Sequence, residues 1–87
     1  MLQERKEVIE ALSERENDRV EDRELRELLE DASRFYIAGG SYELDGDKKE
    51  ARACYEEAKR KIGQYDEVRE IEKESEEYDI IWENNLP

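Results

Sequence analysis

The acidic stretch that begins at Asp45 is the part of the sequence closest in composition to a metal-binding loop. A calcium loop of the helix–loop–helix type places acidic ligands at its first, third and fifth positions, glycine at the sixth and glutamate at the twelfth. Counting from Asp45, Asp47 occupies the third position and Glu56 the twelfth, but the fifth is Lys49 and the sixth is not glycine. We therefore predict that this stretch holds no calcium and that the chain has no metal site.

The residues most used in catalysis are scarce in this chain. It contains no histidine, which removes the commonest general base and a frequent metal ligand. Cys54 is the only cysteine, and no sequence neighbour is suited to lower its pKa, so we interpret it as a small buried side chain. With 27 acidic residues, neighbouring carboxylates are expected by chance and mark a solvated surface. We predict that the protein is not an enzyme and uses no cofactor.

Charge is distributed unevenly along the 87 residues. Residues 1–31 contain 12 acidic and 6 basic residues, a net charge of −6, and residues 32–65 contain 6 and 7, a net of +1. Residues 66–87 contain 9 and 2, a net of −7. Because phosphate binding needs a basic surface, we expect no direct contact with nucleic acid. The expected partner is another protein, and a basic protein suits the two acidic segments.

The location of the protein is predicted from features that the sequence lacks. No apolar run approaches the length that spans a membrane, and the N-terminal sequence has no hydrophobic signal region. A single cysteine excludes an internal disulfide and fits a reducing compartment. We expect a cytoplasmic protein that does not associate with membranes.

The apolar residues recur three and four positions apart, as on one face of an α-helix, and no stretch alternates as a strand does. The sequence thus predicts one all-α domain, a small bundle of three to four helices. We expect a short first helix, a polar linker over residues 13–24, a long second helix over residues 25–44, and a third helix that ends at Gly63. A fourth, acidic helix should follow, with its core-facing positions at Val68, Ile71, Ser75, Tyr78 and Trp82.

The link between the second and third helices has its own signals. Gly46 suits the position just after a helix, where a left-handed backbone is common. Asp47 suits the N-cap of the next helix, and Glu50 three residues later would complete a reciprocal capping box. Two further capping boxes, at Ser13 and Asp18, offer starts for the second helix.

Residues 32–65 resemble one tetratricopeptide repeat, a 34-residue helix–turn–helix unit. The matching positions, in register and without a gap, are Phe35, Ala38, Gly39, Tyr42, Gly46, Ala51, Tyr55 and Ala58. Ala38 stands where leucine is usual, and Gly63 stands where proline is usual. A generic helical hairpin packed around the same residues is the alternative. In either case residues 1–31 form an acidic helical segment before the hairpin, and residues 66–87 form an acidic capping helix and tail after it.

The resemblance implies a non-catalytic protein–protein interaction module or small adaptor subunit. Repeats of this family hold peptides on the concave face of their first helix, which corresponds here to Ser33, Tyr36, Gly40 and Glu43. The resemblance also implies that the small residues let the two helices approach closely. The aromatic residues that should fill the space between them are Phe35, Tyr42 and Tyr55.

Two other roles fit the same sequence. The acidic segments suit a decoy, an inhibitor protein, for example viral, that occupies the basic nucleic-acid-binding surface of a partner. The other role is a purely structural subunit that docks through residues 78–87. Ile81 and Trp82 in this tail are candidate anchors for a partner, although closure of the core explains them equally well. A lone repeat leaves one face uncovered, so we expect the helices that begin near Leu2 and near Val68 to cap it, or else the chain pairs with itself.

Overall fold

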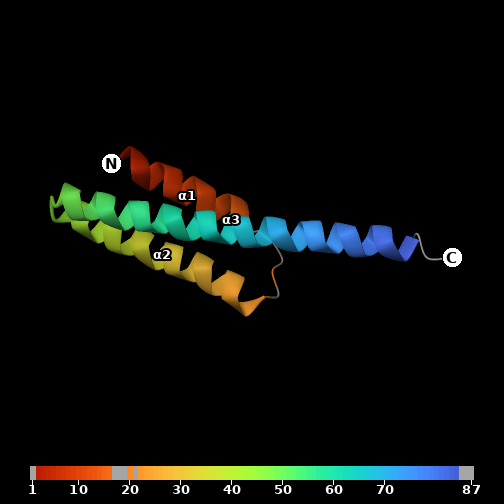
Figure 1. Cartoon of the computed structure of the whole chain (residues 1–87). Helices are drawn as coiled ribbons and strands as arrows, with labels where there is room; N and C mark the ends of the chain where they lie inside the picture. Colours follow the sequence, from red (N-terminus) through yellow and green to blue (C-terminus); the bar gives the residue numbers. More distant parts are fainter. Residues whose placement is uncertain (1, 17–19, 21, 85–87) are drawn as a thin grey trace.

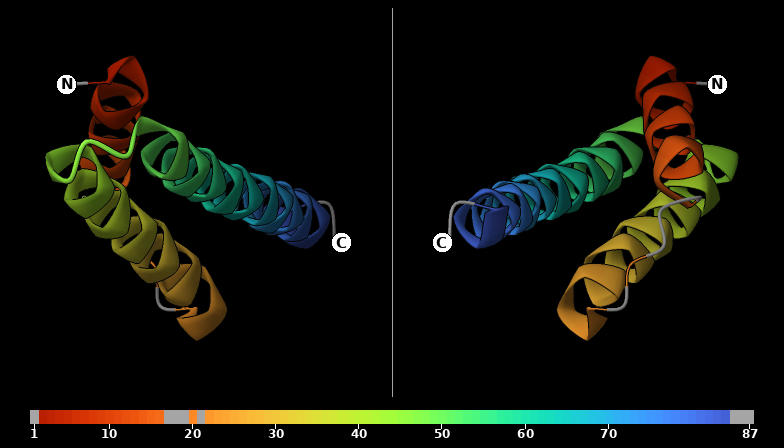
Figure 2. Two further views of the ribbon diagram at one scale, coloured as in Figure 1. Left: turned by 90° about the vertical axis from the view of Figure 1, so that its left-hand side faces the viewer. Right: turned by 90° about the vertical axis from the view of Figure 1, so that its right-hand side faces the viewer.

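Three helices make up the structure, a computed structural model that describes residues 2–16, 20 and 22–84, with side chains described as far as residue 71. They are α1 (Gln3–Glu16), α2 (Arg23–Leu44) and α3 (Lys48–Asn84), and the described residues contain no strand (Figure 1). The predicted all-α bundle is confirmed. Helices α2 and α3 form an antiparallel hairpin, and α1 lies against both of them (Figure 2).

The start of α2 differs from the sequence prediction. Ser13 lies inside α1, so it caps no helix, and Asp18 lies outside the described residues. The N-cap is Asp22, whose carboxylate accepts a hydrogen bond from the backbone N–H of Glu24 at 2.9 Å. Asp22 can act in this way because its backbone is extended, as an N-cap requires.

The corner between α2 and α3 forms with the predicted glycine and N-cap, but the Glu50 half of the predicted capping box does not form. Gly46 has a φ of 82°, a left-handed conformation that glycine adopts without strain, and it follows Asp45, the C-cap of α2. The Asp47 carboxylate caps α3 by accepting from the backbone N–H of Glu50 at 3.3 Å. The N–H of Asp47 donates to the carbonyl oxygen of Tyr42 at 2.9 Å, so α2 rather than Glu50 satisfies it.

The prediction that a helix ends at Gly63 is wrong, because α3 continues through it as one helix of 37 residues. Gly63 does not have a positive φ, which a glycine that terminates a helix normally adopts. Glycine inside a helix costs only about 1 kcal/mol relative to alanine, and no proline follows to force a break. The predicted third and fourth helices are therefore a single element.

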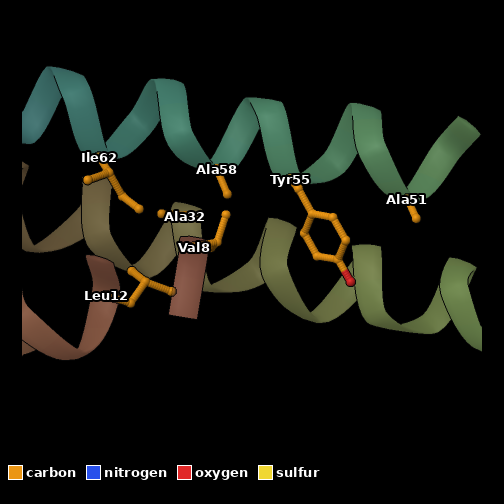
Figure 3. Close-up of a cluster of buried hydrophobic side chains, with 7 residues drawn as sticks. All are labelled: Val8, Leu12, Ala32, Ala51, Tyr55, Ala58 and Ile62. Carbon is orange, nitrogen blue, oxygen red and sulfur yellow. The ribbon is translucent and has the colours of Figure 1, made fainter. Parts of the chain in front are cut away.

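The core lies where all three helices meet (Figure 3). Its buried side chains come from α1, α2 and α3, and they are Val8, Leu12, Ala32, Ala51, Tyr55, Ala58 and Ile62. Three of the seven are alanines, and such small residues let helix backbones approach closely. The predicted filling of the hairpin is correct for Tyr55, and Phe35 is partly buried. The prediction that Tyr42 fills the space between the two helices is wrong, because Tyr42 is 40% exposed.

Cys54 is only half-buried, beside the core rather than inside it. Burial raises the pKa of its thiol, and the negative charge of Glu50 adds to the effect. A thiol with a raised pKa is a poor nucleophile at neutral pH.

Helix α3 is much longer than the bundle around it. At a rise of about 1.5 Å per residue it measures about 55 Å, against about 33 Å for the 22 residues of α2. Most of its C-terminal half, residues 66–84, extends past the ends of α1 and α2 (Figure 1), and the molecule measures 65 × 21 × 18 Å. No helix among the described residues is both long and apolar enough to cross a membrane.

Candidate functional site

Helix α1 covers much of the face that the sequence predicts to hold a peptide. The Arg5 side chain donates a hydrogen bond from Nε to the hydroxyl of Tyr36 at 3.3 Å, and its guanidinium carbon lies 5.4 Å from the centre of the Tyr36 ring. This guanidinium group also lies 3.9 Å from the Cβ position of Gly40. The carboxylate of Glu43 accepts a hydrogen bond from the backbone N–H of Leu2 at 3.3 Å. Tyr36, Gly40 and Glu43, three of the four predicted face residues, thus lie beside Leu2 and Arg5 at the N-terminal end of α1.

Apolar burial and ion pairs together hold α1 in this place. Val8 and Leu12 point into the core, and Arg15 forms a bidentate pair with Asp66 of α3, at 2.7 and 2.6 Å. Glu7 also pairs with Lys59. The N-terminal half of α3, residues 48–65, carries six basic and three acidic residues, a net charge of +3. Acidic α1 therefore packs against the basic half of α3.

A small polar cluster lies under the N-terminal end of α1. Burial raises the pKa of Tyr55 to about 12, and the Glu43 carboxylate contributes to the shift. The pKa of Arg5 is raised by its hydrogen bond to Tyr36. Arg5 therefore stays charged and Tyr55 stays neutral at physiological pH, so this cluster is suited to hold α1 rather than to transfer protons.

Among the described residues, two shallow grooves border α1, and they include three of the four predicted face residues but not Glu43. The larger, of about 470 Å³, is lined by Arg5, Tyr36, Ile37, Gly40, Ser41 and Leu44. The smaller, of about 220 Å³, is lined by Leu12, Glu16, Leu29, Glu30 and Ser33. Ser33 therefore borders a different groove from Tyr36 and Gly40. The sequence analysis missed Ile37 and Leu44, which are exposed apolar residues seven positions apart on α2.

The C-terminal half of α3 presents apolar side chains away from the bundle. Val68 is 40% exposed and Ile71 is 65% exposed, so the prediction that they face the core is wrong. Ile71 follows Ile62 by nine residues, and at 3.6 residues per turn these lie on opposite sides of one helix. A break at Gly63 would have let Ile71 turn back toward the core. The uninterrupted α3 directs it away from the core.

The candidate anchors Ile81 and Trp82 fall within α3, but their side chains lie outside the described residues. The sequence around them is strongly acidic. Residues 66–84 carry nine acidic and two basic residues, a net charge of −7. Helix α3 is therefore basic where it packs in the bundle and acidic where it extends beyond it.

The described residues contain no group of three carboxylate or thiol side chains arranged to hold a metal ion. Searches against protein-family models, curated proteins and solved structures find no match for the chain. Its function is therefore inferred from its own residues, and the surfaces on which that inference rests are the grooves beside α1 and the outward face of α3.

Proposed function

We propose that the protein is a non-catalytic protein–protein interaction module that holds its partner along the C-terminal half of α3. The observation that carries this proposal is the exposure of Ile71 on the side of α3 that faces away from the core. Apolar side chains of this size, exposed on an otherwise polar helix, are typical of the anchors that dominate binding energy in protein interfaces. Val68, one turn earlier, adjoins Ile71.

The way in which α3 is held supports the same function. The N-terminal half of α3 packs into the core through Ala51, Tyr55, Ala58 and Ile62. At the start of the C-terminal half, Asp66 forms an ion pair with Arg15 of α1. A helix that is continuous with a packed helix loses less conformational freedom on binding than an isolated peptide does. In this proposal α1 completes the hairpin by covering its face, and the partner binds elsewhere.

A second candidate function is the acidic decoy. The net charge of −7 over residues 66–84 of α3 favours it, because an acidic helix can compete with nucleic acid for a basic cleft. The two functions differ in what they require. A decoy depends on the carboxylates of the C-terminal half of α3, whereas an interaction module depends on the exposed apolar side chains there, Val68 and Ile71.

The test compares proteins captured by the immobilised chain and by three variants. Ile71→Gln removes the exposed apolar side chain without adding charge. Ile37→Gln is the matched control, because Ile37 is the same residue type, is 66% exposed and lies on α2. Replacement of Glu70, Glu74 and Glu77 with glutamine removes three charges.

The interaction module predicts that Ile71→Gln loses partners that the wild type and Ile37→Gln both retain, as quantified by mass spectrometry. Loss on the triple glutamine variant alone would favour the decoy. If all four proteins capture the same set, the C-terminal half of α3 is not the binding surface and the proposal fails.

A further inference from the structure

We infer that a second copy of this chain binds to the exposed groove on α2, so that two α2 helices cross each other in antiparallel directions at Gly40 and Ser41. This surface is separate from the one proposed above on α3, and the inference does not depend on that proposal. Three features carry it: the shape of the groove, the lack of charge on the helix around it, and the charges at its two ends.

The groove has the shape that a crossing helix needs. Its exposed apolar side chains, Ile37 and Leu44, lie two turns apart on one side of α2, and Leu44 is 89% exposed. Gly40 and Ser41 lie between them and line the same groove. A Cβ atom on Gly40 would meet nothing outside its own helix nearer than the Arg5 guanidinium group, 3.9 Å away. A second helix can therefore come close at the two small residues and pack against the large ones on either side.

The groove lies in the longest uncharged stretch of the chain. Charged residues make up 48% of the sequence, but residues 35–42 contain none. Arg5 of α1 borders the groove, where it donates to the hydroxyl of Tyr36 and interacts with the charge of the Glu43 carboxylate. Because the net charge is −12, two copies repel each other wherever acidic surfaces meet. This stretch of α2 lets two copies approach without that repulsion.

The charges at the ends of the groove favour antiparallel helices. Arg34 and Asp45 are eleven residues, or about three turns, apart, so they lie along the same edge of α2. When Ile37 of one copy packs against Leu44 of the other, Arg34 of the first lies opposite Asp45 of the second, and two-fold symmetry repeats the pair. Parallel helices would instead bring like charges together. Within one chain Arg34 is exposed and forms a long ion pair with Asp31, at 3.7 Å, so it is free to reach a second copy.

Antiparallel helices also separate the most acidic parts of the two copies. In each copy α3 runs antiparallel to α2, and most of its C-terminal half extends past the N-terminal end of α2 (Figure 1). Two antiparallel α2 helices therefore direct the two C-terminal halves, each with a net charge of −7 over residues 66–84, to opposite ends of the dimer. Charges so far apart are screened by salt, whose range is about 8 Å at about 0.15 M.

The inference is tested with the full chain by sedimentation equilibrium, from about 10 μM to about 1 mM and at about 0.15 M salt. We expect a reversible dimer of the weak class that small interfaces form. Ile37→Gln and Leu44→Gln should each raise its dissociation constant at least about tenfold, the scale set by loss of one interface anchor. Ile71→Gln, which makes the same change on α3, is the control and should leave the dissociation constant unchanged. Circular dichroism checks the helix content of each variant.

Charge reversal tests the antiparallel arrangement. Arg34→Glu and Asp45→Arg should each raise the dissociation constant at least about fourfold, because like charges then meet at both ends of the contact. The double variant has the net charge of the wild type and restores opposite charges, so its dissociation constant should return to within about twofold of the wild-type value. Net charge alone predicts a different result, since Asp45→Arg lowers the acidity of the chain and would then strengthen the dimer.

Several results would overturn the inference without touching the proposed function. A chain that stays monomeric at about 1 mM has no such dimer. If it is monomeric and Ile37→Gln loses captured proteins, the groove binds a different protein. Loss of the dimer with Ile71→Gln in place of Leu44→Gln would locate the contact on α3. If the reversals have no effect, or the double variant does not recover, the two α2 helices do not pair in antiparallel directions.

Discussion

Gly39 in α2 faces the ring of Tyr55 in α3 so closely that a Cβ atom on residue 39 would lie 2.5 Å from Cε1 of the tyrosine. The ring cannot withdraw easily, because Tyr55 is fully buried in the centre of the bundle. The absence of a side chain at residue 39 is therefore what allows α2 to pass over a tyrosine. The contact is between glycine and an aromatic ring, whereas the sequence suggests contact between two helix backbones.

Replacing Gly39 with alanine should destabilise the protein by about 1–3 kcal/mol, because overpacking of the Tyr55 ring outweighs the gain in helix propensity. Gly63→Ala is the control. A Cβ atom there would meet nothing within 4 Å, so this change should stabilise α3 by about 0.5–1 kcal/mol. Urea unfolding monitored by circular dichroism gives both values. Changes of the same sign in the two variants would contradict the close contact at Gly39.

The raised pKa of Tyr55 predicts a loss of stability at alkaline pH. In the folded state this pKa is about 12, against 10.0 for a free tyrosine, so the folded protein holds the proton more tightly. As pH rises from 10 toward about 12, the unfolded chain loses this proton first, and the free energy of unfolding falls. Below pH 10 the contribution is fully present.

Tyr55→Phe has no such proton and should show a shallower fall over the same window. Thermal melts of the two proteins at several pH values measure the difference, and the other titrating groups are common to both. Parallel curves would mean that the Tyr55 hydroxyl titrates normally.

The bidentate pair between Arg15 and Asp66 should couple α1 to α3. Arg15 is largely buried, so a double-mutant cycle with alanine at both positions should give a coupling energy of about 1 kcal/mol. The exposed pair of Arg23 and Glu27, four residues apart on α2, serves as the control and should give about 0.3–0.5 kcal/mol. If the first cycle gives no more than the second, the pair does not anchor α1.

The corner residue Asp47 should act as a helix cap and not as a metal ligand. Asp47→Ala removes the acceptor for the Glu50 N–H and should cost about 1 kcal/mol. Millimolar calcium and a chelator should each leave the melting temperature of the wild type unchanged. A marked rise with calcium would show that the acidic corner binds it.

The corner was predictable because its signals are local. Gly46 favours the end of α2, and Asp47 offers a side-chain acceptor to the first turn of α3. Both residues therefore favour the same turn between the two helices. Gly63 lacks that agreement. Neither a capping residue nor a proline follows it directly, and α3 passes through it. The absence of a cap was the signal that a helix would continue.

The position of α1 could not be predicted in the same way. Its contacts with α2 and α3 join residues far apart in the sequence, such as Leu2 with Glu43 and Arg15 with Asp66. The 3.6-residue period identified Val8 and Leu12 as apolar, but it does not state which surface receives them. Sequence reasoning therefore found the residues of a candidate binding face and named the first helix as a possible cap of the hairpin, but it did not place that helix over the candidate binding face.

Because α3 continues without a break through Gly63, the orientation of its C-terminal half relative to the bundle is fixed. One residue inserted between Asp66 and Ile71 would turn the exposed Ile71 side chain by about 100° around the helix axis and move it about 1.5 Å along that axis. Seven inserted residues would return it to within about 20° of its original direction, about 10 Å farther out. The number of residues between Asp66 and Ile71 would thus decide on which side of the molecule a partner bound at Ile71 lies, while the core and the pair of Arg15 with Asp66 stay in place.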